Sequence, residues 1–304
     1  MIDFQNVSFS YGEESSGGGI RNVNLTINTG EFVLLTGESG CGKTTITRLV
    51  NGLVPHYYEG NLEGDVLLDG KSVSDTPLYD LAAMVGSVFQ NPKSQFFNVD
   101  TDSELAFACE NLGYPQEDIL KRIDRTVSDY HIEDLMGRSV FALSGGEKQK
   151  IACASSSVLL PGIMVLDEPS SNLDMAAIDD LRQVLSLWKK QGKTILIAEH
   201  RLYYLHDLAD RVLYVKDGEI EREYTPAEFD SLSDGTRKEM GLRPFSLSKL
   251  KPANQYQAHT AKQMEFQNFC FAYKKREPES LHIPSAELLS LIHISEPTRH
   301  AQIS

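Results

Sequence analysis

A glycine-rich loop with one lysine and two threonines offers the first candidate for chemistry in this chain. Glycines lack a Cβ atom, so the backbone N–H groups of such a loop can turn inward and surround phosphate oxygens. The loop opens a helix that we expect to run to about Leu53, and a helix N-terminus favours an anion. We expect the Lys43 ammonium to reach the β- and γ-phosphates of a nucleotide and the Thr44 hydroxyl to bind Mg²⁺. The predicted phosphate-binding residues are Gly37, Glu38, Ser39, Gly40, Cys41, Gly42, Lys43, Thr44 and Thr45.

Two carboxylates and two other polar side chains follow apolar runs elsewhere in the chain. Asp167 and Glu168 come directly after Ile163–Leu166. We expect Asp167 to bind Mg²⁺, and Glu168 to be the base that polarises an attacking water. We expect His200 to contact the γ-phosphate and Gln90 to sense Mg²⁺ and the water. Taken alone, His200 is as readily a structural residue and Gln90 a loop residue, so both roles depend on the neighbouring motifs.

Four short runs of apolar residues supply the strands that must position these groups. An uninterrupted apolar run is typical of a strand buried on both faces of a parallel sheet. Ligands bind at the carboxyl ends of such strands, which is where the polar side chains stand in this sequence. The four runs are Phe32–Leu35, Met84–Phe89, Ile163–Leu166 and Thr194–Ala198.

Other patterns place a second sheet and a group of helices around this core. Alternating apolar residues from Ile2 to Phe9 and from Val23 to Ile27 predict an antiparallel β subdomain. Residues 91–145 lack strand-like runs and show helical spacing, which predicts a helical subdomain. A helix over Ala176–Gln191 carries an apolar stripe that we assign to the core. The predicted fold is therefore α/β, with a mainly parallel core sheet, an antiparallel β subdomain and a helical subdomain.

Composition limits the classes of partner. The chain has 304 residues, 41% of them hydrophobic, which fits one large α/β domain plus a fragment. A net charge of −14 argues against a nonspecific grip on nucleic acid or anionic lipid, so we expect protein partners. No apolar run approaches the roughly 20 residues that cross a bilayer. The four cysteines show no CxxC spacing, so we expect reduced thiols in a cytosolic chain.

The order of the motifs resembles the nucleotide-binding domain of ATP-binding-cassette (ABC) transporters, over about residues 1–224. Besides the phosphate loop and carboxylates, the resemblance depends on Leu143-Ser144-Gly145-Gly146-Glu147 and Ser171-Asn172-Leu173-Asp174. It implies a P-loop NTPase cassette that binds ATP and Mg²⁺ and hydrolyses ATP, with Lys43, Gln90, Glu168 and His200 as its catalytic residues.

The same resemblance assigns residues to an interface between two cassettes. It implies that Ser144, Gly145, Gly146 and Glu147 contact ATP held by a facing cassette, and that Asp174 links the two sites. It also implies that Tyr11 stacks on adenine. Packing of Tyr11 against its own neighbours is the competing interpretation.

A closer resemblance is to the ATPase subunits of energy-coupling-factor (ECF) importers, which take up vitamins and metal ions. It depends on Gly86–Pro92, Leu143–Lys150 and Ala198–Leu202. It implies a second ABC cassette, a transmembrane coupling subunit and a substrate-binding membrane subunit as partners. The chain would then work at the cytoplasmic face of the cell membrane, bound through those subunits.

An internal repeat predicts a second cassette. Phe4–Tyr11 returns as Phe266–Tyr273 with five of eight positions identical, and Leu25–Glu31 has a counterpart in Leu281–Glu287. We expect residues 264–288 to begin a second, truncated ABC domain. Residues 225–263 would be the linker between the cassettes, with room for short helices.

The last residues do not continue the repeat. Residues 289–304 resemble the translation of a sequencing-library adapter, so we expect a non-native tail and a longer natural chain. A real, short C-terminus is the competing interpretation.

A different class of twin-cassette protein is the alternative function. Soluble ABC proteins of this kind act on the ribosome, and they usually carry a long, charged helical linker between cassettes. The segment 225–263 is short and lacks that pattern, so the sequence favours transport. ABC ATPases of DNA repair would carry inserted coiled coils or zinc modules, which this sequence lacks.

Overall fold

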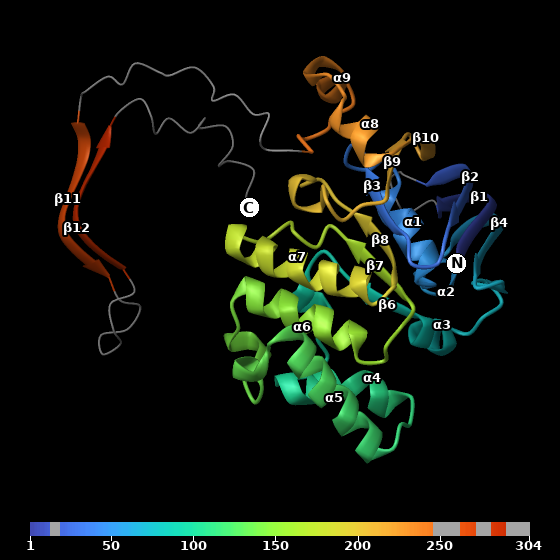
Figure 1. The fold of residues 1–304 in the computed structure, drawn as a ribbon, viewed down its shortest axis with the longest axis horizontal. Coiled ribbons are helices and arrows are strands. Elements are labelled where there is room, and N and C mark those ends of the chain that lie inside the picture. The colour runs from blue at the N-terminus through green and yellow to red at the C-terminus, as the bar shows by residue number, and fades with distance from the viewer. Residues whose placement is uncertain (13–18, 246–261, 272–280, 290–304) are drawn as a thin grey trace. The chain divides into compact units, whose positions relative to one another are not determined.

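The computed structural model describes residues 1–12, 19–245, 262–271 and 281–289 (Figure 1). The chain divides into two compact units, Met1–Lys249 and Leu250–Ser304, and each is described by itself.

A six-stranded sheet lies at the centre of the first unit. Its strands are β3 (Phe32–Thr36), β6 (Val85–Val88), β7 (Ile163–Asp167), β8 (Thr194–Ala198), β9 (Arg211–Lys216) and β10 (Glu219–Tyr224). Their order in the sheet is β10-β9-β3-β8-β7-β6. All neighbours pair in parallel except β9 and β10, which are antiparallel. The prediction of a mainly parallel core sheet is confirmed, and the four apolar runs are four of its strands.

A second sheet of the first unit is antiparallel, as predicted. Its strands are β1 (Ile2–Tyr11), β2 (Ile20–Ile27), β4 (Gly60–Leu68) and β5 (Lys71–Ser72), in the order β2-β1-β4-β5. The buried positions of β1 switch from even numbers, Ile2 and Phe4, to odd numbers, Val7 and Phe9. The pairing with β2 shifts register between Phe4 and Val7, and Asn6 there has a φ of 51°. A bulge of this kind adds one residue and so keeps both apolar pairs on the same face.

Helices flank the sheets. The α-helices are α1 (Lys43–Val50), α2 (Leu53–His56), α3 (Leu78–Met84), α4 (Thr101–Asn111), α5 (Gln116–Tyr130), α6 (Gly145–Ser157), α7 (Met175–Lys190), α8 (Pro226–Asp230) and α9 (Asp234–Glu239), and short 3-10 helices cover Pro92–Ser94, Glu133–Leu135, Val140–Ala142 and Tyr203–Leu205. The helix after the phosphate loop ends at Val50, earlier than predicted, because the chain turns at Gly52 with a φ of 76°. Among the described residues, no helix combines the length and apolar character needed to cross a membrane.

The central strands bury both of their faces. In β3, Phe32 and Leu34 lie in a core that also contains buried residues of α6 and α7. Val33 and Leu35 lie in another core, shared with β1, β2 and α1. The α7 stripe predicted to be core is fully part of the first of these cores. Every residue of the run is therefore apolar because neither face of the sheet meets water.

The first unit extends beyond the predicted boundary at Tyr224. The structure places Phe229 and Phe245 at 0% exposure in the main core, with their rings 5.2 Å apart. The α9 end also approaches the phosphate loop, because Gly241 packs against the Glu38 side chain. Residues 225–245 therefore belong to the first unit, whereas we predicted a linker. The sequence around Phe229 and Phe245 is mainly polar and the two residues are widely spaced, so no local pattern predicted that they are buried.

The second unit contains one described hairpin, β11 (Lys262–Phe271) and β12 (Leu281–Leu289). Its register differs from that of the segment it resembles. Phe4 pairs with Leu25 in the first unit, but their counterparts Phe266 and Leu281 pair with Ala286 and Phe271. Within the described residues, β11 pairs with β12 alone, whereas β1 is also held by β4. The truncated second cassette therefore stays a prediction, and residues 290–304 of the predicted tail lie outside the described residues.

Candidate active site

The phosphate loop connects β3 to α1, and its glycines are required by its backbone. Gly37 has a φ of 150° and Gly42 a φ of 112°, both in the region that favours glycine. A Cβ atom on Gly37 would lie 2.1 Å from the carbonyl oxygen of Val215 in β9. Any larger residue at position 37 would therefore push the loop away from the sheet.

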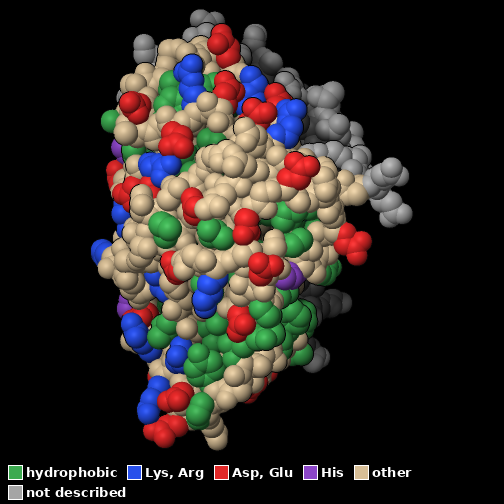
Figure 2. All heavy atoms as spheres, turned by 90° about the vertical axis from the view of Figure 1, so that its right-hand side faces the viewer, with side chains coloured by type: hydrophobic (Ala, Val, Ile, Leu, Met, Phe, Trp, Pro, Cys, Tyr) green, Lys and Arg blue, Asp and Glu red, His purple; other side chains and the backbone are tan. Residues whose placement is uncertain are grey.

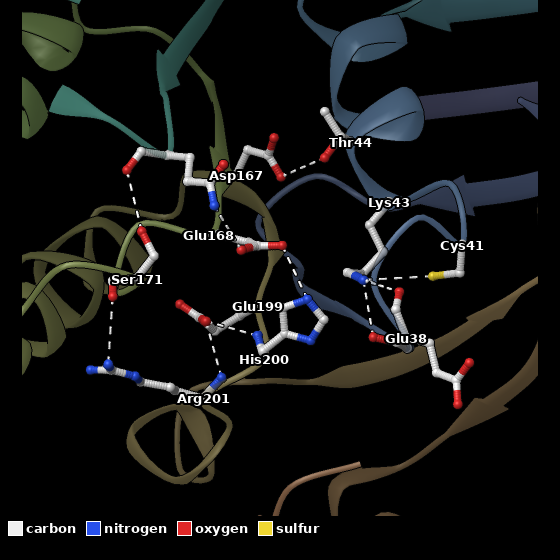
Figure 3. A network of polar contacts seen from close by, with 12 residues as sticks. Glu38, Cys41, Lys43, Thr44, Asp167, Glu168, Ser171, Glu199, His200 and Arg201 are labelled. Atoms are coloured by element: carbon white, nitrogen blue, oxygen red, sulfur yellow. Dashed lines mark hydrogen bonds and ion pairs between the residues drawn. The ribbon is translucent and has the colours of Figure 1, made fainter. Parts of the chain in front are cut away.

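The Lys43 ammonium is buried inside this loop. Lys43 is 4% exposed, and its Nζ donates to the carbonyl oxygens of Gly37 (3.0 Å) and Glu38 (2.8 Å). The Cys41 Sγ lies 3.6 Å from the same nitrogen (Figure 3). No carboxylate pairs with Lys43 in the part of the chain that the structure describes. A nucleotide phosphate would supply the negative charge that this buried cation lacks.

Thr44 and Asp167 meet at the junction of α1 and β7. The Thr44 hydroxyl donates to an Asp167 carboxylate oxygen at 3.1 Å (Figure 3). Burial raises the pKa of Asp167, and the Thr44 bond offsets part of that rise. Mg²⁺ prefers a few protein oxygens of this kind and takes its remaining ligands from phosphate and water. The two side chains thus fit a magnesium–nucleotide complex.

Glu168 lies between two polar side chains from other strands. Gln90 Nε2 donates to one carboxylate oxygen at 3.0 Å, and His200 Nε2 lies 3.1 Å from the other (Figure 3). The His200 contact is the main cause that lowers the pKa of Glu168. Glu168 itself has a φ of 45°, a conformation that is strained for a glutamate and that is concentrated at functional sites. The geometry therefore supports an ionised carboxylate held in place to accept a proton.

Tyr11 contacts α1 rather than open solvent. Its hydroxyl lies 3.2 Å from the Thr45 hydroxyl and accepts a hydrogen bond from Arg48 at 3.1 Å. Its ring makes an edge contact with Phe9, 4.8 Å between centroids. The Arg48 guanidinium also covers the Tyr58 ring at 4.0 Å. These contacts agree with the packing interpretation of Tyr11 and leave its adenine contact a prediction.

Sequence reasoning missed Arg48 and Tyr58 in this cluster. Arg48 follows Thr44 by four residues on α1, so the helical spacing alone places both on one side of the helix. Tyr58 had no such signal, because it follows the short α2 in irregular chain.

The signature residues form the start of α6. The Ser144 Oγ accepts from the Glu147 N–H at 3.3 Å, and a Glu147 oxygen accepts from the Ser144 N–H at 2.7 Å. This reciprocal pair is a capping box. The second Glu147 oxygen accepts from Arg138 at 3.0 Å, and the Ser144 backbone bond is the main cause that lowers the Glu147 pKa. Gly146 packs closely on α7, since a Cβ there would lie 2.8 Å from the Ala177 Cβ.

The structure keeps the signature residues apart from the phosphate loop. Ser144, Gly145, Gly146, Glu147 and Asp174 line one hollow of about 560 Å³, whose described lining contains no residue of the phosphate loop. Gln90 and Asp167 line another hollow, of about 480 Å³, beside α1. Asp174 caps α7 by accepting from the Ala177 N–H at 2.9 Å. Six predicted residues thus lie near one another, namely Lys43, Thr44, Gln90, Asp167, Glu168 and His200, and the signature residue Gly145 shares a further hollow, of about 440 Å³, with Gln90.

Comparison with known proteins identifies the family. A model of the family described as ABC transporter matches residues 20–171, half of the 304 residues. A Treponema denticola protein, whose name places it among ABC transporter ATP-binding proteins, is 47% identical over 83% of this chain and 51% of its own length. The chain thus spans about half the length of that relative.

Solved structures agree with this match. The cbiO1 protein of Clostridium perfringens, described as part of the ABC transporter complex cbiONQ, gives a TM-score of 0.67 at 27% identity, over 78% of this chain and 93% of that one. The ATP-binding cassette MJ0796, solved as a dimer in a post-hydrolysis state with ADP and Pi, gives 0.63 at 26% identity, over 74% of this chain and 99% of that one. The chain therefore belongs to the ABC transporter family, and its first unit has the fold of the family's ATP-hydrolysing cassettes.

Proposed function

We propose that this chain is an ATPase subunit of an ECF-type importer, which works as one of a pair of cassettes on membrane subunits. The observation that carries the proposal is that the hollow lined by the signature residues has no residue of the phosphate loop in its described lining. One cassette then supplies half of each ATP site. A facing cassette would bring its own Ser144, Gly145 and Gly146 over the γ-phosphate. The similar MJ0796 cassette was solved as a dimer bound to ADP and Pi.

The side chains around Glu168 account for hydrolysis in such a composite site. Mg²⁺ held by Thr44 and Asp167 would neutralise phosphate charge when bound. Lys43 would exchange its loop carbonyls for phosphate oxygens. Glu168 would accept the proton of the attacking water while Gln90 and His200 hold its two oxygens in place.

A surface groove near Gln90 supports a membrane partner. The groove, of about 390 Å³, lies between α3, β6 and α4, and its lining includes Leu78, Phe97 and Phe107. Phe97 is 74% exposed although its ring stacks on Phe107 at 4.8 Å. Figure 2 shows hydrophobic side chains gathered on the lower part of one face of the molecule. Exposed apolar side chains beside a groove are typical of a protein interaction site.

The likeness to cbiO1 favours the ECF class among ABC transporters, since that protein is part of the cbiONQ complex. We expect a vitamin or a metal ion as the transported substrate, and a position at the cytoplasmic face of the cell membrane. The incorporation of residues 225–245 into the first unit shortens any linker further, which weighs against a ribosomal twin-cassette protein. The facing cassette would be a fused second half or another copy of this chain.

Dependence of the ATPase rate on protein concentration tests the paired mechanism. The chain of residues 1–304, which carries one complete set of motifs, should show activity that rises faster than linearly with its concentration, because each site needs two cassettes. Glu168→Gln should bind ATP, lose turnover and accumulate as a dimer in size-exclusion chromatography. A specific activity that does not change with concentration and survives Glu168→Gln would contradict the paired mechanism.

Charge placed in the groove tests the membrane partner. We expect Phe97→Asp to reduce recovery of the chain in the membrane fraction when it is expressed with candidate membrane subunits from the same organism. Leu120→Asp is the matched control, since Leu120 is 53% exposed on α5 and does not line the groove. Equal recovery of the two variants would count against the groove as the docking site.

A further inference from the structure

A second buried carboxylate lies next to His200 and takes no part in the chemistry proposed above. Glu199 is 1% exposed. One of its oxygens accepts from the backbone N–H groups of His200 (2.7 Å) and Arg201 (3.0 Å). The other accepts from the Ser170 N–H (3.2 Å) and the Tyr204 hydroxyl (2.8 Å). The carboxylate is therefore fully hydrogen-bonded by groups from two separate stretches of chain, without a lysine or arginine salt bridge among the described residues.

Arg201 also connects the His200 segment to the stretch that contains Ser170, but as a hydrogen-bond donor where Glu199 is an acceptor. Its guanidinium donates to the carbonyl oxygens of Leu173 (2.9 Å) and Ser171 (3.5 Å). Figure 3 shows His200 in contact with Glu168, Arg201 in contact with Ser171, and Glu199 bonded to His200 and Arg201. The two residues on either side of His200 thus hold the segment 170–173 at three of its four residues.

The segment 170–173 is the chain that connects Glu168 to Asp174. Its first part is tied to Glu168 by the Ser171 N–H, which donates to the Glu168 carbonyl at 3.1 Å. Its far end leads into Asp174, which lines the signature hollow. A shift of this segment would therefore move both Glu168 and the signature hollow relative to His200.

We propose that Glu199 and Arg201 are positioning residues, which fix the His200 segment and the segment 170–173 as one unit. Through this unit, the contact of His200 with Glu168 and the placement of Asp174 toward a facing cassette are set together. The inference deepens the proposed function and rests on it. It gives the residues that flank His200 a positioning role and no direct contact with ATP.

Glu199→Gln in the full-length chain tests this role. The amide keeps the shape of the side chain. Its NH₂ group, however, is a donor, and it would face donors whose hydrogen bonds a carboxylate oxygen accepts in the wild type. We expect kcat to fall about ten- to a hundredfold, because small displacements of catalytic groups are costly. ATP affinity, measured with a fluorescent ATP analogue, should stay within about twofold, because the Lys43 loop is not touched.

Two further variants separate positioning from general destabilisation. Tyr130→Phe removes a buried hydroxyl that donates to Ser157, far from His200 in the sequence. This variant should lower the melting temperature, while kcat stays within about twofold. Combined with His200→Ala, Glu199→Gln should have a smaller effect on kcat than it has alone, because it acts through His200.

Three outcomes would overturn the inference. They are an unchanged kcat in Glu199→Gln, a loss of kcat in Tyr130→Phe that matches the loss in Glu199→Gln, and full additivity with His200→Ala. Failure of the proposed function is a different result, since it would show as a wild-type rate that does not depend on protein concentration.

Discussion

The residues of the hydrolytic corner, Lys43, Thr44, Gln90, Asp167, Glu168 and His200, come from four strand ends. Three contacts join side chains from different strand ends, namely Thr44–Asp167, Gln90–Glu168 and His200–Glu168, while Lys43 bonds its own loop. Those of the signature corner, Ser144 to Glu147 with Asp174, contact the first turns of α6 and α7 and the nearby Arg138 instead. Glu147 bonds Ser144 and Arg138, and Asp174 bonds Ala177. The first corner is assembled by the fold as a whole, and the second is two helix N-termini placed side by side.

This difference indicates which half of the proposed chemistry lies within a single cassette. The hydrolytic corner brings together a buried ammonium, a hydroxyl and two carboxylates, which is a complete set for phosphate, metal and water. The signature corner offers the N-terminus of α6, a helix of 13 residues, facing an open hollow. Helix N-termini attract anions, but the Glu147 carboxylate already stands there, neutralised by Arg138. Under the proposed function, the phosphate that this corner meets would come from a facing cassette.

Removing the base should have the largest effect and should break only the hydrolytic corner. We expect Glu168→Gln to lower kcat by about a hundredfold or more, because a general base typically contributes that much. Binding of ATP should persist, since Lys43 and Thr44 are unchanged. Steady-state phosphate release and equilibrium binding measure the two effects. Retention of more than a tenth of the wild-type kcat would mean that another group takes the proton.

A charge in the signature corner should have the next largest effect. Ser144→Asp keeps a good helix cap but adds a negative charge where a facing γ-phosphate would lie. We expect kcat to fall by roughly tenfold or more through electrostatic repulsion, with ATP binding to the single chain unchanged. Ser144→Asn is the matched control, because it caps α6 without the charge and should retain most of the activity. Equal loss in both variants would show that the added charge is not the cause, and would count against a γ-phosphate beside Ser144.

The two corners were predictable from the sequence to different degrees. The apolar runs before Asp167, Gln90 and His200 predicted that these side chains meet at one edge of a parallel sheet, and the structure brings them together. The chemistry of a strand end is local, so its position follows from the run that precedes it. The signature roles came from resemblance alone. A capping box explains Ser144 and Glu147 without any ligand, so the pattern has a structural reading that sequence cannot separate from a functional one.

Other features depended on contacts between distant parts of the chain. The burial of Phe229 and Phe245 completes a core formed by residues 32 to 212, and no local periodicity signals it. Glu199 and Arg201 lie in the motif Ala198–Leu202, but their partners at 170–173 lie about 30 positions earlier. Such pairings become visible only when β7 and β8 are known to be neighbours.

Replacing His200 tests the hydrolytic corner through the pH dependence of the ATPase rate. The His200 contact is the main cause that lowers the Glu168 pKa, so His200→Gln should raise that pKa. Because the base must be ionised, activity is lost as pH falls through its pKa, and the acid limb of kcat should move to higher pH. The rate at saturating Mg²⁺ as a function of pH measures this. His206→Gln is the control, since His206 contacts exposed Asp207 at 2.8 Å instead, and it should leave the limb in place.

A fourth substitution acts on stability at the opposite end of β8 and should have the smallest effect. Lys193, directly before β8, is 9% exposed and donates to the Pro161 carbonyl, and burial lowers its pKa to about 8. The unfolded chain binds this proton up to a pH near its ordinary pKa of 10.5. Between these values the unfolded state carries more protons, so stability should rise with pH, and this gain is lost as pH falls through about 8.

We expect wild type to gain on the order of 1 kcal/mol over Lys193→Met between neutral pH and a pH near 10, a figure reduced for partial solvation of the ammonium. Urea unfolding at several pH values measures the difference, with exposed Lys71→Met as the control that should follow wild type. The ATPase rate of Lys193→Met should keep the wild-type acid limb, because Glu168 lies beyond the carboxyl end of the neighbouring β7. A shifted limb in Lys193→Met would mean that the pH dependence of the rate reports the stability of the fold, and the assignment of that limb to Glu168 and His200 would fail.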